Sequence, residues 1–158
     1  MRDTMRDAPG VGLAAPQIGL ALQLAVIEDR AEYHSDIPAE VLRERDRAPV
    51  GFHVIINPVI ELGEQRAEFF EGCLSMPGYT AIVPRARSVT VEALNERAER
   101  VRLQAKGWYA RILQHEIDHM NGTVYVDRMR SRSLMTTDNF TRYWKSKTSA
   151  QVCEDLAI

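Results

Sequence analysis

The sequence is poor in cysteine and contains no long apolar run, and each shortage excludes a class of protein. Its two cysteines, Cys73 and Cys153, are too few for the disulfide framework of a small secreted domain, so we expect a reducing compartment. No apolar run approaches the length of a transmembrane helix. The first ten residues, MRDTMRDAPG, lack an apolar signal core, and their acidic residues are atypical of a transit peptide.

Neither sign of charge is in large excess. The net charge is −2, with 20 basic and 22 acidic residues, so the whole chain does not indicate a nucleic-acid or anionic-membrane partner. Lysine supplies only three of the basic residues, Lys106, Lys145 and Lys147, and arginine supplies the rest. We expect one compact domain over residues 1–158, which can bury roughly 70% of the surface of its unfolded chain.

Short runs rich in β-branched residues dominate the chain, and one segment has a clear helical period, so the expected class is α+β. The helix is Trp108–Met120, and Asn121-Gly122 after it is a natural left-handed stop. A first helical segment over residues 1–7 should end at Pro9. The expected strands are Leu22–Ile27, Val54–Ile60, Ala67–Phe70, Ala81–Val83, Val89–Leu94, Arg100–Gln104 and Thr123–Val126, with a hairpin turn at Asn95 and Glu96.

Two segments fall outside this pattern. Residues 28–47 are polar and charged, which predicts a surface insertion with one helical turn after Pro38. Residues 138–158 form a weakly patterned C-terminal tail, in which Asp138 is a candidate helix cap.

The stretch RILQHEIDHMNG places two histidines four residues apart, with a glutamate directly after the first. On a helix, His115 and His119 share one face and can bind one metal ion, whereas Glu116 points elsewhere and can hold a proton beside a metal-bound water. A chance HExxH string without a metal is the alternative. Asp118 has the position of an outward-facing helix residue.

A catalytic site of this kind usually takes three protein ligands, and Cys73 in EGCLS is the candidate for the third. A thiolate with two imidazoles suits Fe²⁺, Zn²⁺, Co²⁺ or Ni²⁺. The alternative is that Cys73 is a small buried hydrophobe, which is the commonest role of a free cysteine and the one expected for Cys153.

Three segments, GVGLAAPQIG (10–19), EGCLS (71–75) and QHEIDHMNG (114–122), match the signature motifs of the peptide deformylases in order and spacing. The resemblance runs from about Met1 to about Met129, and Met120 stands where leucine is more usual. The residue pattern GW-ARILQHE-DH is most similar to the pattern of the family branch that contains organelle-type enzymes and their bacterial relatives. The resemblance implies an α+β fold with antiparallel sheets around a central metal-binding helix.

The activity implied by this resemblance is hydrolysis of the N-formyl group from the initiator methionine of new polypeptides, with release of formate. The metal, foremost Fe²⁺, with Zn²⁺, Ni²⁺ or Co²⁺ as substitutes, would be held by Cys73, His115 and His119. Glu116 would be the general base and acid. The amide of Gln17 and the backbone N–H of Leu74 would stabilise the oxyanion.

Further residues are expected to bind the substrate. Gly10 and Gly12 allow an extended peptide to approach the backbone, so that it adds as a strand to a sheet edge. Trp108 and Ile112 share the helix stripe of the histidines, which favours a pocket for the methionine side chain over a purely structural packing role. By the family pattern, Arg85 is a candidate partner for Glu71 or for another carboxylate near the site. The full set of expected substrate-binding residues is Val11, Gly12, Glu71, Gly72, Trp108 and Ile112.

Two other functions remain open from the sequence. A zincin-like HExxH endopeptidase would need a further ligand on a second helix, which the downstream sequence lacks. A catalytically silent metal- or peptide-binding relative is the other, because relatives normally carry a longer segment before the first motif. The expected partners are N-formyl-methionyl nascent peptides and, transiently, the ribosome; TRYWKSK (141–147) is too short to indicate RNA binding. The expected compartment is the bacterial cytoplasm, or a mitochondrion or plastid if a targeting segment is missing.

Overall fold

A computed structural model of the chain describes residues 1–8 and 10–158, in two compact units. The first unit comprises Met1–Gln65 and Ala86–Gly122, and the second comprises Arg66–Arg85 and Thr123–Ile158. Each unit contains one sheet with antiparallel pairing, which confirms the expected α+β class. That the two units form one domain stays a prediction. Pro9, the expected stop of the first helix, lies outside the described residues.

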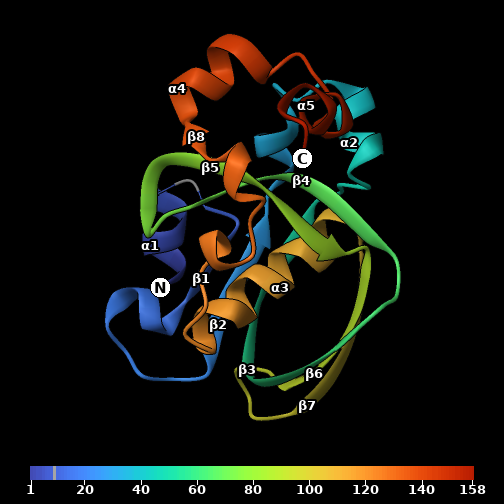
Figure 1. Cartoon of the computed structure of the whole chain (residues 1–158). Coiled ribbons are helices and arrows are strands. Elements are labelled where there is room, and N and C mark those ends of the chain that lie inside the picture. The colour runs from blue at the N-terminus through green and yellow to red at the C-terminus, as the bar shows by residue number, and fades with distance from the viewer. Residues whose placement is uncertain (9) are drawn as a thin grey trace. The chain divides into compact units, whose positions relative to one another are not determined.

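The first unit is a five-stranded sheet crossed by one long helix, α3 (Gly107–Met120), which contacts every strand (Figure 1). The strand order β1-β2-β3-β6-β7 leaves β1 and β7 at the edges. Side chains of β6 alternate, so that Val89, Val91 and Ala93 are buried in the same core cluster as the buried side chains of α3. The strands are β1 (Gly12–Ala14), β2 (Leu24–Asp29), β3 (Val50–Leu62), β6 (Ser88–Leu94) and β7 (Arg100–Lys106).

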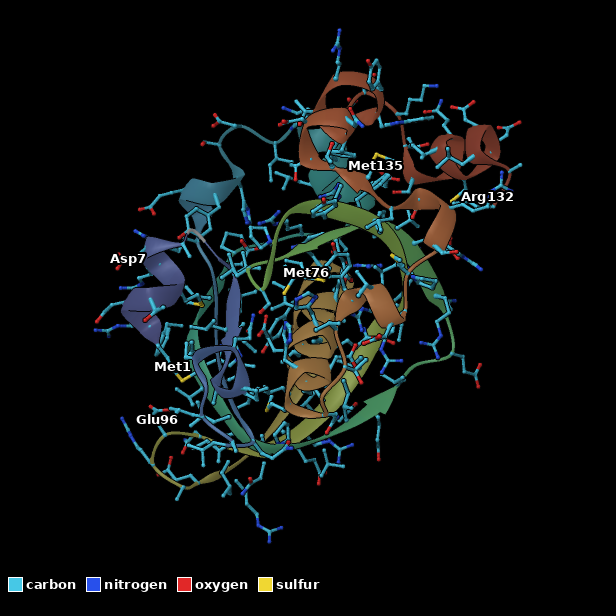
Figure 2. The ribbon with its side chains drawn as sticks, turned by 60° about the vertical axis from the view of Figure 1, so that its left-hand side comes forward. Met1, Asp7, Met76, Glu96, Arg132 and Met135 are labelled. Atoms are coloured by element: carbon cyan, nitrogen blue, oxygen red, sulfur yellow. The ribbon has the colours of Figure 1, made fainter. Side chains whose placement is uncertain are left out.

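Local sequence signals place most elements of this unit correctly. Helix α1 (Arg2–Asp7), labelled at Met1 and Asp7 in Figure 2, buries Met5 completely. The turn between β6 and β7, at the Glu96 label of Figure 2, is closed by Asn95, whose Oδ1 accepts from the N–H groups of Arg97 (2.9 Å) and Glu99 (3.0 Å). The expected hairpin is confirmed.

The segment 28–47 differs in one respect from the sequence pattern, which places all of it on the surface. Glu28 and Asp29 end β2 and are buried, because arginine side chains pair with both carboxylates. The remainder contains the short 3-10 helix η2 (Ala31–His34) and the helix α2 (Ala39–Glu44). Helix α2 begins directly after Pro38, so the predicted helical turn is confirmed.

The second unit has a three-stranded sheet with the order β4-β5-β8. Figure 2 labels Met76 at the start of β5 and Met135 in β8. Behind β4, the helix α5 buries Val152 with Phe70 and Ile82. The elements are β4 (Arg66–Cys73), β5 (Met76–Ala86), η3 (Tyr125–Asp127), η4 (Ser131–Ser133), β8 (Met135–Thr136), α4 (Thr137–Asn139), η5 (Phe140–Trp144) and α5 (Ser149–Leu156).

Two predictions in this unit are wrong. The strand expected at residues 123–126 is instead the entry to η3, because the carboxylate of Asp127 accepts from the N–H of Val124 at 2.8 Å and closes a turn. Asp138 does not cap a helix. Thr136 caps α4 by accepting from the N–H of Asn139 at 3.2 Å, and Asp138 lies in the first turn. No described helix is both long enough and apolar enough to cross a membrane.

Candidate active site

The two histidines of the QHEIDHMNG motif meet on one face of α3. Their Nε2 atoms are 3.2 Å apart, and their ring centroids are 4.9 Å apart at an interplanar angle of 77°. Two nitrogens bound tetrahedrally to one ion at about 2.0–2.1 Å would be roughly 3.3 Å apart. The spacing of His115 and His119 therefore fits two ligands of one metal ion. His119 is buried and His115 is partly exposed, so the pair has one open side.

Glu116, between the two histidines in sequence, is buried with a relative exposure of 4%. Its side chain lies against the backbone of Gly12 in β1: a β-carbon at position 12 would be 2.5 Å from Cδ and 2.7 Å from Cγ of Glu116. Glycine is therefore needed at position 12 for Glu116 to keep this position. Asp118, which the helix period assigns to an outward face, is instead buried, because α3 is buried on nearly all sides.

The GVGLAAPQIG segment forms β1 and the short 3-10 helix η1 (Ala15–Ile18), both packed on α3. Gln17 lies in η1, and its Oε1 accepts from the backbone N–H of Ala14 at 2.8 Å. Because this bond uses the oxygen of the amide, it orients the nitrogen end as the donor to any further group. Pro16 lies in the first turn of η1, where its fixed φ suits a helix. Gly19 ends the helix with φ 80°, a left-handed conformation that glycine adopts without strain.

In the second unit, Cys73 is the last residue of β4, and Leu74 and Ser75 form the two-residue turn into β5. The sulfur of Cys73 accepts a hydrogen bond from the backbone N–H of Ser75 at 3.4 Å. Such a bond favours the thiolate, which is the metal-binding form of cysteine. Tyr125 packs in the same cluster, and burial, with smaller contributions from Cys73 and Glu71, raises the pKa of its phenol.

Glu71 and Arg85 form a buried pair across β4 and β5. The guanidinium of Arg85 donates to both carboxylate oxygens of Glu71, each at 3.0 Å, and the side chains are 3% and 4% exposed. The backbone carbonyl of Glu71 also accepts from the hydroxyl of Thr80 at 2.8 Å. The suspected partnership of Arg85 with Glu71 is thus confirmed. Gly72 follows this pair, and a β-carbon there would meet only the Tyr79 carbonyl at 3.4 Å, an ordinary contact.

The residues expected to form the substrate pocket lie in the first unit. Ile112 is buried in its core, and Val11 and Trp108 pack half-buried against the same core. Three guanidinium groups lie over the indole of Trp108, those of Arg45, Arg47 and Arg111. The roles expected for these residues in substrate binding stay predictions.

Sequence reasoning missed two sets of residues around α3. Asp29, Arg45 and Arg47 lie in the segment 28–47, whose polar composition gives no sign that its arginines reach Trp108. The excess of arginine over lysine was the one available signal, because arginine makes planar, bidentate and stacked contacts. The other missed residue is Gln114, whose buried amide pairs with both backbone groups of Ala86.

Among the described residues, the candidate donors for a metal ion are Cys73, His115 and His119. The histidines belong to the first unit and the cysteine to the second. One thiolate and two imidazoles are borderline-soft donors, suited to Fe²⁺, Zn²⁺, Co²⁺ and Ni²⁺, so the donor set fits the metal that the motifs imply.

Comparison with known proteins gives a consistent result. A chloroplastic peptide deformylase 1A of Solanum lycopersicum is 49% identical over 140 residues, which cover 88% of this chain and 50% of that protein. Peptide deformylase 3 of Streptomyces avermitilis is 48% identical over 159 residues, which cover all of this chain and 69% of that protein. This chain therefore spans half the length of the first relative and about two thirds of the second.

A solved structure agrees with these sequences. The Met-Ala-Ser-bound crystal structure of a class I type b peptide deformylase from Acinetobacter baumannii superposes with a TM-score of 0.70 at 34% identity, covering 82% of this chain and 76% of that chain. The family model described as polypeptide deformylase matches residues 1–134. This chain belongs to the polypeptide deformylase family.

Proposed function

We propose that this chain is a metal-dependent hydrolase that removes the formyl group from the N-terminal formyl-methionine of new polypeptides and releases formate. The observation that carries the proposal is the pair of Nε2 atoms on α3, 3.2 Å apart, in a member of the deformylase family whose buried Glu116 directly follows His115 in the sequence. Such a pair with a neighbouring acid is the arrangement that metal-assisted amide hydrolysis requires.

The proposed metal ligands are Cys73, His115 and His119, closing around one divalent ion. We infer Fe²⁺ as the native ion, with Zn²⁺, Ni²⁺ and Co²⁺ as substitutes that the same donors accept. When bound, such an ion would lower the pKa of a coordinated water towards neutrality and so would supply the nucleophile near neutral pH. The hydrogen bond from Ser75 supports this assignment, because it helps to hold the sulfur of Cys73 in its ligand form.

Glu116 is the proposed general base and acid. Its carboxylate takes a proton as water attacks the formyl carbon, and it gives the proton to the amine nitrogen as the carbon–nitrogen bond breaks. Burial and contact with Gly12 support this role, because they restrict the carboxylate to one place without a bulky neighbour. The products are formate and a free amino terminus.

Two neutral donors are proposed for the oxygen of the formyl group, on which negative charge develops. They are the side-chain amide of Gln17 and the backbone N–H of Leu74. The bond from Ala14 to the Gln17 oxygen supports the first assignment, because it uses the acceptor end of the amide and leaves the nitrogen as the donor end. Loss of one such donor typically costs about 3–4 kcal/mol of transition-state stabilisation.

The substrate is proposed to bind as an extended strand. In the five-stranded sheet β1 is an edge strand, so we propose that a peptide pairs with the backbone of Gly12 and of Val11, which directly precedes the strand. Glu71 and Gly72 are proposed to contribute from β4. Trp108 and Ile112, on the histidine stripe of α3, are proposed to line the pocket for the methionine side chain, a flexible apolar group that such surfaces accommodate.

The nascent chain is the partner that this activity requires, and transient contact with the ribosome is a further proposal. The basic segment 141–147 gives it little support, because Lys147 pairs with Asp155 at 2.6 Å and lies over the ring of Trp144. Cosedimentation with ribosomes at low and moderate salt tests the contact. We place the protein in the bacterial cytoplasm, with an organelle as the alternative.

Formate release from formyl-Met-Ala-Ser tests the function. The purified chain is loaded anaerobically with Fe²⁺ or Ni²⁺, its metal content is measured, and formate is assayed with a coupled enzyme. We expect turnover by the wild type and a loss of roughly 10²–10⁴-fold in Glu116→Ala with its metal retained. A metal-loaded wild type that binds the peptide but releases no formate would show a silent binding protein instead.

A further inference from the structure

The segment 28–47 is docked on the first turn of α3. Gly107, the first residue of that helix, has φ 58°, and a β-carbon there would lie 2.5 Å from the carbonyl oxygen of Asp46 and 2.6 Å from that of Arg45. The backbone of the segment therefore touches the backbone of the helix. The ammonium of Lys106 is also 3.5 Å from the carboxylate of Asp46, in an exposed pair that adds little.

The end of α2 directs the chain into this contact. The N–H of Arg47 bonds to the carbonyl of Leu42 at 2.9 Å, and the N–H of Asp46 bonds to that of Arg43 at 3.1 Å. With Asp46 at φ 46°, these two bonds form a Schellman ending, which reverses the chain sharply. The reversal places the side chains of Arg45 and Arg47 on the same neighbour, the indole of Trp108.

Arg47 is fixed at its other end by a buried carboxylate. Its guanidinium donates from Nε to Asp29 Oδ2 at 2.8 Å and from Nη2 to Oδ1 at 2.9 Å, and the two side chains are 9% and 1% exposed. His34 Nε2 lies 3.0 Å from the same carboxylate. Asp29 is the last residue of β2, so the sheet itself determines where this guanidinium lies.

The indole of Trp108 lies beneath the fixed guanidinium. The Cζ atoms of Arg45, Arg47 and Arg111 are 4.8, 5.3 and 5.8 Å from the ring centroid. Guanidinium groups at these distances attract the face of an indole, and partly buried contacts are stronger than exposed ones. Rotation of the indole would break these contacts, so the arginines hold it in one orientation.

We propose that Arg47 is a positioning residue for substrate selection: anchored by Asp29, and with Arg45 beside it, it sets the orientation of Trp108 and thereby the preference for methionine as the first residue. This inference rests on the proposed function, in which Trp108 lines the methionine pocket. Arg47 itself touches no reacting atom. Loss of Arg47 therefore changes which first side chain the pocket accepts. The chemical step depends on the metal ligands and Glu116 and is not directly affected.

The expected signature is a loss of selectivity. In Arg47→Ala, the ratio of kcat/KM for formyl-Met-Ala-Ser to that for formyl-Ala-Ala-Ser falls roughly ten-fold, the size of effect that an apolar pocket gives for a side chain of this size. The fall comes mainly from a higher KM for the methionine peptide. If Arg47 had a merely structural role, Arg47→Ala would lower kcat/KM for both peptides by the same factor, and that result would overturn the proposal.

A double-mutant cycle tests whether the effect passes through Trp108. In the Trp108→Leu background, Arg47→Ala should alter the selectivity ratio by less than about two-fold, because the ring that it orients is gone. A full ten-fold effect in that background would contradict the proposal. Arg47→Lys keeps the charge but loses the bidentate donor, so its selectivity ratio should lie between those of the wild type and Arg47→Ala. Arg102→Ala is the matched control, because its pair with Glu92 at 3.0 Å is exposed.

A spectroscopic readout separates this inference from the proposed activity. In a Trp144→Phe background Trp108 is the remaining tryptophan, and its near-ultraviolet circular dichroism reports a fixed indole. Arg47→Ala should weaken those bands while the far-ultraviolet spectrum stays that of the wild type. Unchanged tryptophan bands would overturn the orienting role. If the metal-loaded wild type releases no formate from either peptide, the proposed function fails, and the link to substrate selection fails with it.

Discussion

The side chain of Glu116 packs against the backbone of Gly12 and occupies the space that a β-carbon at position 12 would need. A β-carbon at position 12 would lie 2.5 Å from Cδ and 2.7 Å from Cγ of the glutamate, distances that atoms in a folded protein do not adopt. Both residues belong to the first unit, one to the edge strand β1 and the other to α3. The glutamate is the flexible partner, so a larger residue at position 12 would displace the carboxylate before it disturbed the fold.

Gly12→Ala should therefore abolish most of the activity but lower the stability of the fold only slightly. If Glu116 is the general base, its displacement costs a large part of the roughly 10²–10⁴-fold that such a group contributes to kcat. The check is formate release by the metal-loaded variant, together with its melting temperature. Gly51→Ala is the control, because a β-carbon at that position meets no atom within 4 Å. Near wild-type kcat in Gly12→Ala would show that the contact does not position the base.

The histidine pair and its helix could be predicted because their signal is local: a spacing of four within one helix, ended by an Asn-Gly pair. The contact of Gly12 with Glu116 and the stacking of Arg45 on Trp108 join residues far apart in the chain. The hydrophobic periodicity of the sequence around each of these residues gives no sign of such long-range contacts. The strand expected at residues 123–126 failed for a related reason, because a single side chain, Asp127, outweighed the β-propensity of its neighbours.

The ion pair of Arg6 with Glu28 should make stability depend on pH. Hydrogen bonds from Arg6 are the largest cause that holds the pKa of Glu28 below its ordinary value of 4.5, against the opposing effect of burial. A lowered carboxyl pKa stabilises the fold above pH 4.5, and that stabilisation is lost as the pH falls through the lower pKa of the folded state. Arg6→Ala should thus destabilise the protein at neutral pH and by less in acid.

Urea unfolding of wild type and Arg6→Ala at a series of pH values measures this difference. The comparison of the two proteins at each pH cancels the titration of other groups. Arg102→Ala breaks an ion pair whose side chains are 60% and 63% exposed, so it should have little effect at any pH. A destabilisation by Arg6→Ala that stays constant down to the acid limit would show that its contribution is packing and not charge.

The pair of Glu71 with Arg85 makes a contrasting prediction, because both side chains are almost wholly buried. Arg85→Met leaves the carboxylate of Glu71 without its charged partner, which should cost about 3–5 kcal/mol. The double variant Glu71→Leu with Arg85→Met removes both charges and should recover most of that loss. Calorimetry of the single and double variants decides: if the double variant is no more stable than Arg85→Met, the isolated charge is not the cause.

Gln114 should be needed for its amide and not for its volume. Its Oε1 accepts from the N–H of Ala86 at 3.0 Å, and its Nε2 donates at 2.9 Å to the carbonyls of both Ala86 and Ala110. The amide thereby pairs with both backbone groups of Ala86, the buried last residue of β5, as a neighbouring strand would. Gln114→Leu has a similar size but leaves these groups unpaired, at a cost of about 1–3 kcal/mol for each buried group that finds no other partner.

Gln114→Glu separates the two ends of that amide. An ionised carboxylate can still accept from Ala86, but it cannot donate, and it would face two carbonyl oxygens. We therefore expect the glutamate variant to be destabilised at neutral pH even though its shape is nearly unchanged. Hydrogen exchange at the amide of Ala86 should stay slow in Gln114→Glu and become fast in Gln114→Leu, because only the first keeps an acceptor there. Equally slow exchange in the two variants would mean that burial alone protects the amide of Ala86.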